Sequence, residues 1–133
     1  MKIDGIDHVV FTVRDIDTVR DIDATCEFYA KALGMEVVTF GGNRKALSFG
    51  SQKINLQQSG RESTLIAEKP TPGSADVCFV TFVALAEVIA HLKSTGVNLI
   101  AGPVERIGAR GRMMSIYFRD PDMNLIEVAN YNE

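Results

Sequence analysis

The sequence predicts an α+β fold: two βαβββ modules in one chain that form a cup-shaped, mostly antiparallel sheet, with the helices on its outer face. Three observations lead to this prediction. A strand-like run, a helical run and three further strand-like runs occur twice in the same order. Each helical run ends at a glycine, Gly34 or Gly96. A polar, proline-containing segment separates the halves, so we assign module one to residues 4–58, a linker to 59–74 and module two to 75–131.

In module one, β-branched apolar runs predict the strands, and apolar residues on one helical stripe predict the helix. Gly41-Gly42-Asn43 and Gly50-Ser51 are turn signals, and the second of them makes a hairpin of the last two strands. The expected elements are a strand at 6–13, a helix at 24–33, and strands at 35–40, 44–49 and 52–57.

Module two repeats this order. The expected elements are a strand at 75–82, a helix at 85–95, and strands at 97–101, 113–119 and 124–130. Residues 104–112 contain three arginines and two glycines and are expected to form a long flexible loop, either a mobile basic lid or a plain solvated loop. Turn chemistry explains Asp120 and Asp122 of the DPDM turn, so we do not expect them to be catalytic.

A tandem repeat of six residues lengthens the first module. VRDIDT at 13–18 is followed at once by VRDIDA at 19–24. If one copy is removed, the two modules fall into register. Because the repeat lies between a strand and a helix, where insertions are well tolerated, we expect a longer loop or an extra helical turn.

Composition excludes several classes of protein. A chain of 133 residues is the size of a single domain, and an apolar share of 46% rules out disorder as its main state. A net charge of −3 does not fit nucleic-acid binding, and no apolar run is long enough to cross a bilayer. No signal peptide or C-x-x-C pair is recognisable. We therefore expect a cytoplasmic protein in which Cys26 and Cys78 are free thiols that act as small buried hydrophobic residues.

Strand alternation brings four polar side chains to equivalent places, two from each module. His8 and Asp76 on the first strands, and Asn55 and Glu127 on the last strands, are expected to face away from the helices. Buried carboxylates need a compensating charge, and a divalent cation supplies one. Imidazole with carboxylates fits a six-coordinate metal better than structural zinc. For Asp76, a turn cap after the Pro-Gly-Ser sequence is the alternative.

These features resemble the vicinal oxygen chelate superfamily, which comprises glyoxalases, fosfomycin and bleomycin resistance proteins, and extradiol dioxygenases. The stretches that carry the resemblance are IDHVVFTV, EFYAKALGMEVV, GSADVCFV and IYFRDPDMNLIEV. The last is the most specific, since such a string typically ends there in a metal-ligand Glu. Within the superfamily the chain is similar to the small single-domain glyoxalase-domain proteins. His8 and Glu127 match the family pattern of ligands, whereas Asp76 stands where a His is usual and Asn55 where a Glu is usual.

The resemblance implies a metal-dependent enzyme, most similar to glyoxalase I (lactoylglutathione lyase), which acts on the hemithioacetal of a 2-oxoaldehyde and a thiol. The expected cofactor is a divalent ion: Ni, Co, Mn, Zn or Fe. The expected metal ligands are His8, Asn55, Asp76 and Glu127. Glu127 is also the expected catalytic residue, because a carboxylate that loosens from the metal can move a proton.

Two alternatives remain open: a protein related to extradiol dioxygenases, and a non-enzymatic protein that binds a small molecule, as bleomycin resistance proteins do. In each case the partner is a small molecule rather than nucleic acid or a membrane. The expected substrate-binding residues are Arg44, Gln57, Ser115 and Tyr117. Open sheet edges predict a homodimer.

Overall fold

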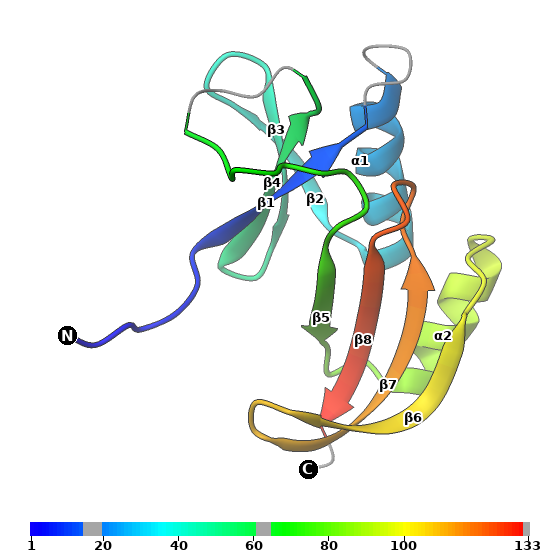
Figure 1. Ribbon diagram of the computed structural model, residues 1–133. Helices are drawn as coiled ribbons and strands as arrows, with labels where there is room; N and C mark the ends of the chain where they lie inside the picture. The colour runs from blue at the N-terminus through cyan, green and yellow to red at the C-terminus, as the bar shows by residue number, and fades with distance from the viewer. Residues whose placement is uncertain (15–19, 61–64, 132–133) are drawn as a thin grey trace. The chain divides into compact units, whose positions relative to one another are not determined.

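The computed structural model describes residues 1–14, 20–60 and 65–131. The chain divides into two compact units, unit one (residues 1–73) and unit two (residues 74–133), each with one four-stranded sheet and one long helix (Figure 1). In the described segments, no helix has the length and apolar character needed to span a membrane.

Unit one contains β1 (His8–Val13), α1 (Arg20–Leu33), β2 (Glu36–Phe40), β3 (Arg44–Phe49) and β4 (Gln52–Gln58). The strand order is β1-β4-β3-β2, with β1 parallel to β4 and the other pairs antiparallel. α1 contacts all four strands. Its buried face carries Cys26, Tyr29 and Ala32, which recur at helical spacing. The helix stops because Gly34 adopts φ 66° and its N–H bonds the Ala30 carbonyl.

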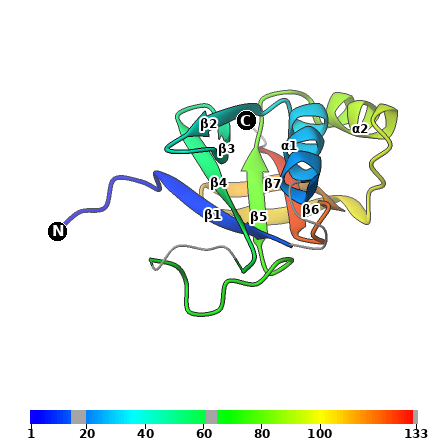
Figure 2. The same ribbon diagram turned by 90° about the horizontal axis from the view of Figure 1, so that it is seen from above.

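Unit two has the same topology. It contains β5 (Asp76–Val80), α2 (Leu85–Ser94), β6 (Ala101–Gly108), β7 (Gly111–Arg119) and β8 (Leu125–Tyr131). The strand order is β5-β8-β7-β6, with β5 parallel to β8, and α2 packs against one face of this sheet (Figure 2). Its core holds Leu92, Ile116, Phe118 and Ile126, all with no exposed surface. The predicted repeat of one βαβββ plan is therefore confirmed.

The second copy of the duplicated hexapeptide contributes to the helix. α1 begins at Arg20, earlier than the predicted start at 24, so residues 20–23 add about one turn to its N-terminus. The extra helical turn is thus the correct alternative for this copy. Most of the first copy, with Val19, lies outside the described residues.

The prediction of a flexible loop at 104–112 is wrong. β6 runs to Gly108 and pairs with β7 from Gly111 onward, so this segment is a strand and a tight hairpin. The expected strand at 97–101 is wrong too, since only Ala101 belongs to a strand. Arginine and glycine content indicated a loop, but backbone pairing with β7 overrides local composition. This segment therefore does not form a mobile basic lid.

The two cysteines differ in exposure. Both are free thiols, as predicted, and Cys26 is buried on the sheet-facing side of α1. Cys78 is exposed, so its prediction as a buried residue is wrong. It faces away from α2, and β5 is an edge strand of its sheet, so only one neighbouring strand shields it.

Candidate functional site

His8 and Asn55 lie on adjacent, paired strands of unit one. Val10 pairs with Asn55 and His8 with Lys53, so the two polar residues are diagonal neighbours on one face. The opposite face carries Phe11, Val13 and Ile54, all buried on the α1 side. Strand alternation therefore places both candidate ligands as predicted, away from the helix.

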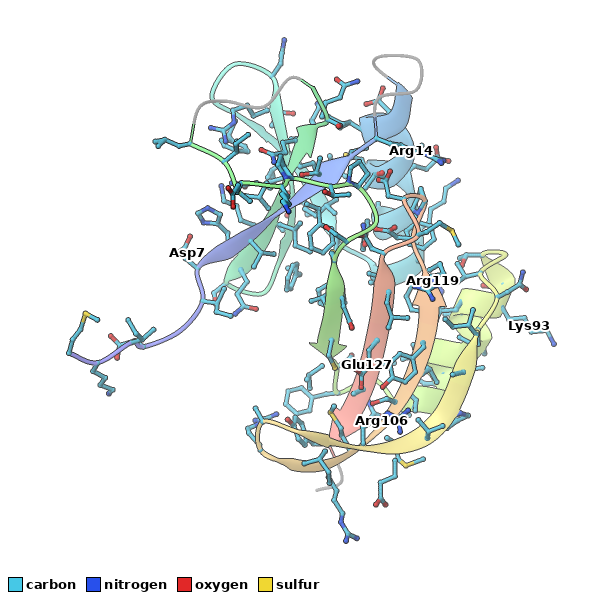
Figure 3. The ribbon with its side chains drawn as sticks, viewed as in Figure 1. Asp7, Arg14, Lys93, Arg106, Arg119 and Glu127 are labelled. Atoms are coloured by element: carbon cyan, nitrogen blue, oxygen red, sulfur yellow. The ribbon has the colours of Figure 1, made fainter. Side chains whose placement is uncertain are left out.

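The imidazole of His8 is held by a neighbouring carboxylate. Its Nδ1 lies 2.8 Å from Oδ2 of Asp7, at the start of the unit-one sheet (Figure 3). An ionised carboxylate can only accept a hydrogen bond, so Nδ1 carries the proton. In the neutral ring, Nε2 then keeps its lone pair. A carboxylate that orients a histidine in this way is the usual second partner of a metal-ligating imidazole.

Asn55 has a buried oxygen without a partner. The residue is 6% exposed, and its Oδ1 makes no hydrogen bond in the described structure. Such an atom costs about 1–3 kcal/mol when water is excluded, so it indicates a missing ligand or water. Its neighbour Gln57 is better satisfied, because its Nε2 donates to Oγ1 of Thr12 over 3.0 Å.

In unit two, Cys78, Glu127 and Tyr117 form a row across three strands. Cys78 pairs with Glu127, and Glu127 with Tyr117, so all three share the face opposite α2. Asp76 is the diagonal neighbour of Glu127 on the same face, which repeats the relation of His8 to Asn55. Its carboxylate caps no backbone N–H of the described residues.

Glu127 repeats the feature seen at Asn55. Its Oε2 is buried and makes no hydrogen bond within the described part of the chain. The residue occupies the equivalent strand of the second repeat, on the equivalent face. A buried carboxylate oxygen without a hydrogen-bond donor is stable only if a bound cation or a proton neutralises its charge.

The thiol of Cys78 stays protonated near neutral pH. Its pKa is raised to about 12, chiefly by partial burial and then by the negative charge of Glu127, with a further contribution from Asp76. A protonated thiol is a weak donor rather than a nucleophile or metal ligand.

Arg106 orients the hydroxyl of Tyr117. Its Nε donates to the Tyr117 oxygen over 2.9 Å, and its guanidinium carbon lies 5.6 Å from the ring centroid. Figure 3 labels Arg106 on β6 and Glu127 on β8. Since the oxygen already accepts a hydrogen bond, the Tyr117 hydrogen is available to another acceptor. The sequence placed Arg106 in a predicted loop, and only the pairing of β6 with β7 brings it to Tyr117.

The remaining predicted residues have distinct surroundings. Ser115 is fully buried, and its Oγ has no partner among the described residues. Arg44 stacks on Phe40 in unit one, 4.7 Å from the ring centroid. Asp120 is structural, as predicted: its Oδ1 accepts the N–H groups of Asp122 and Asn124, and its Oδ2 accepts the Asn124 side-chain amide.

Within residues 1–14, 20–60 and 65–131, no three His, Cys, Asp or Glu side chains cluster as metal ligands do. The donor atoms of each unit therefore decide whether a cation fits. Unit one offers an imidazole nitrogen and an amide oxygen, and unit two offers two carboxylates. Taken separately, the imidazole and amide of unit one and the two carboxylates of unit two are donors that Mn, Co, Ni, Fe or Zn accepts, and one oxygen in each unit has no other partner among the described residues.

Curated relatives cover nearly the whole chain. Virulence protein STM3117 of Salmonella typhimurium is 52% identical over 131 residues, which are 98% of this chain and 87% of that protein. The glyoxalase domain-containing protein RDO1 of Mycosarcoma maydis is 47% identical over 133 residues, 100% of this chain and 72% of that protein.

Solved structures share the fold. An integron cassette protein of V. cholerae, VCH_CASS1, superposes with a TM-score of 0.92 at 49% identity, covering 99% of this chain and 98% of that one. A lactoylglutathione lyase of Agrobacterium tumefaciens has a TM-score of 0.70 at 21% identity, covering 98% and 96%, and shows the fold alone. The family model of the glyoxalase/bleomycin resistance protein/dioxygenase superfamily matches residues 5–128. The chain belongs to that superfamily.

Proposed function

We propose that this protein is a metal-dependent enzyme of the glyoxalase I type, which isomerises the hemithioacetal of a 2-oxoaldehyde and a thiol. The proposed metal ligands are His8, Asn55, Asp76 and Glu127. Glu127 is the proposed catalytic residue, and Arg44, Gln57, Ser115 and Tyr117 are the proposed substrate contacts.

One observation carries the proposal: Asn55 Oδ1 and Glu127 Oε2 are both buried without a hydrogen-bond donor. They occupy equivalent strands and faces of two repeats of one fold unit. Thr25 and Ser115 also have buried oxygens without a partner in the described structure, but these two do not occupy equivalent positions of the repeats. A bound cation would offset the cost of burying the Asn55 and Glu127 oxygens.

Asp7 is not a proposed metal ligand, but its contact with His8 supports the same proposal. Its hydrogen bond leaves Nε2 of His8 as the unprotonated nitrogen, which is the form that binds metal.

The chemistry follows from these groups. A divalent ion held by the proposed ligands would supply a Lewis acid that stabilises negative charge on the substrate. Glu127 would take the proton from the carbon that bears sulfur and return it to the neighbouring carbon, while the hydroxyl proton passes from the first substrate oxygen to the second, which gives a 2-hydroxy thioester without net oxidation. The Tyr117 hydroxyl, whose oxygen already accepts from Arg106, donates to a substrate oxygen.

The test combines metal binding with turnover. Protein stripped with EDTA is titrated calorimetrically with Ni, Co, Mn and Zn, and is then assayed with methylglyoxal and glutathione. Both His8→Ala and Glu127→Gln should weaken metal binding at least about tenfold and abolish turnover. His91→Ala is the matched control, because His91 is an exposed residue of α2. Wild-type protein that binds none of these metals would refute the proposal.

The two alternatives predict different outcomes of the same experiment. An extradiol dioxygenase would require Fe(II) and oxygen, and would yield a coloured ring-opened product from a catechol. Asp76 stands in place of the second imidazole of its usual ligand set, which argues against it. A non-enzymatic binding protein would hold its ligand with EDTA present, and His8→Ala would leave the affinity unchanged.

We also propose that the protein forms a homodimer. β1 and β5 are edge strands, and Val10 and Val80 on them are 48% and 47% exposed. Open edges with apolar residues favour pairing with a second copy. Light scattering should give twice the chain mass at micromolar concentration, and a monomer mass would contradict this.

A further inference from the structure

Two cations share one aromatic ring on the face of unit one that carries His8 and Asn55. The guanidinium carbon of Arg44 lies 4.7 Å from the Phe40 ring centroid, and Nζ of Lys53 lies 4.1 Å from it. Phe40 pairs with Arg44 across β2 and β3, and strand alternation puts Lys53 on the same face as both.

Lys53 reaches Phe40 across a small residue. On β3, Ala46 lies midway between Ser48 and Arg44. Lys53 of β4 pairs with Ser48, and Phe40 of β2 pairs with Arg44, so the two side chains approach each other from opposite sides of Ala46. Ala46 is fully buried, so the lysine stem and the ring close over it. Ala46 is also the direct partner of Asn55. The two cations therefore flank the strand position next to the unpartnered Asn55 oxygen.

Neither cation has an acidic partner in the described residues. Arg44 and Lys53 make no ion pair there, and both charges are balanced only by the face of the ring. Glu36 faces the same way on β2, two strands from Lys53, and is not paired with it. An aromatic face stabilises a cation only weakly at an exposed site, and two like charges on one ring repel each other. An anion placed between them would remove this repulsion.

We propose that Phe40, Arg44 and Lys53 form an anion subsite that binds a carboxylate or phosphoryl group of the substrate. This inference rests on the proposed function. If Asn55 is a metal ligand, the reacting oxygens of the substrate bind near it, and an anion bound beside Asn55 can belong to the same substrate. The planar guanidinium offers two parallel donors to such a group, and the lysine adds a point charge. The chain as a whole carries a net charge of −3, so this basic face does not reflect general positive charge.

Lys45 provides a matched control. It follows Arg44 in the sequence but faces α1, where its Nζ donates to Oγ1 of Thr39 over 2.8 Å. Its charge also acts on the Cys26 thiol of α1. Lys45→Met therefore removes a neighbouring positive charge without altering the proposed subsite.

The test uses full-length protein stripped of metal with EDTA. Inorganic phosphate and, separately, acetate are titrated at constant ionic strength, and binding is followed by amide chemical shifts. We expect saturable shifts in β2, β3 and β4, with Lys53→Met and Arg44→Met each weakening affinity about tenfold and Lys45→Met changing it less than twofold. The stronger of the two anions identifies the group as phosphoryl or carboxylate. Circular dichroism melts confirm that each variant is folded, and Lys53→Arg should retain binding.

Two results would overturn the subsite: no saturable shift with either anion, or equal losses in Lys45→Met and Lys53→Met. Because no metal is present, this experiment is independent of the proposed activity. Anion binding without metal binding would leave the subsite standing and remove the enzyme proposal.

Discussion

Cys78 lies directly opposite Glu127 in the parallel pairing of β5 with β8, on the face away from α2. Partial burial and then the negative charge of Glu127 raise the pKa of the thiol to about 12. An exposed cysteine is thereby kept in its unreactive form beside the proposed catalytic carboxylate.

Cys78 should therefore react slowly with iodoacetamide despite its exposure. At pH 8 a thiol with a pKa of about 12 is only about 10⁻⁴ thiolate. Glu127→Gln removes the negative charge, lowers the thiol pKa and should speed alkylation of Cys78 in EDTA-treated protein at least about tenfold. Mass spectrometry of peptides measures the rate. Glu36→Gln, a change in unit one, should leave the rate as it is, and an unchanged rate in Glu127→Gln would show that the carboxylate does not control the thiol.

Asp7 should contribute to metal affinity although it is not a proposed ligand. Its hydrogen bond fixes the tautomer and orientation of His8, so Asp7→Ala should weaken binding of Co or Zn about 10–100-fold. Calorimetry on EDTA-stripped protein measures this. Asp4→Ala is the control, since Asp4 is exposed and pairs only with Lys2. Equal affinities of these two variants would remove Asp7 from the site.

Strand alternation was sufficient to predict the faces of the candidate ligands. It depends only on neighbouring residues, so the sequence alone could place His8 and Asn55 on the face opposite α1, and Glu127 on the face opposite α2. The shared ring of Phe40 could not be predicted in this way. Its contact with Lys53 crosses β3 diagonally and depends on twist and on the size of Ala46.

The β6–β7 hairpin shows the limit of local reasoning. Three arginines and two glycines indicated a loop, yet the segment is ordered by pairing with β7 and by Tyr131 of β8. The Tyr131 hydroxyl accepts the N–H of Arg110, whose guanidinium lies 4.3 Å from the ring centroid. Such contacts join residues far apart in the sequence, and composition does not reveal them.

Gly108, next to the tip of this hairpin, should tolerate no larger residue without loss of stability. A Cβ there would collide with the Tyr131 hydroxyl and lie 2.8 Å from Sδ of Met113. Gly108→Ala should therefore lower the free energy of unfolding by about 1–3 kcal/mol, measured by urea denaturation. Gly5→Ala has open space around it and should cost little. Similar urea midpoints for Gly108→Ala and Gly5→Ala would mean that the side chains around Gly108 move aside at little cost.

Asp120 tests whether the DPDM turn is structural or catalytic. The residue is 3% exposed and accepts three hydrogen bonds, from the backbone N–H groups of Asp122 and Asn124 and from the side chain of Asn124. Asp120→Ala leaves these donors unpaired and should destabilise the protein by about 2–4 kcal/mol. If Asp120 only holds the turn, metal affinity at a temperature below unfolding should equal that of wild type. Asp23→Ala, which alters an exposed carboxylate on α1, should change neither quantity. Loss of metal binding in folded Asp120→Ala protein would instead give this carboxylate a part in the site.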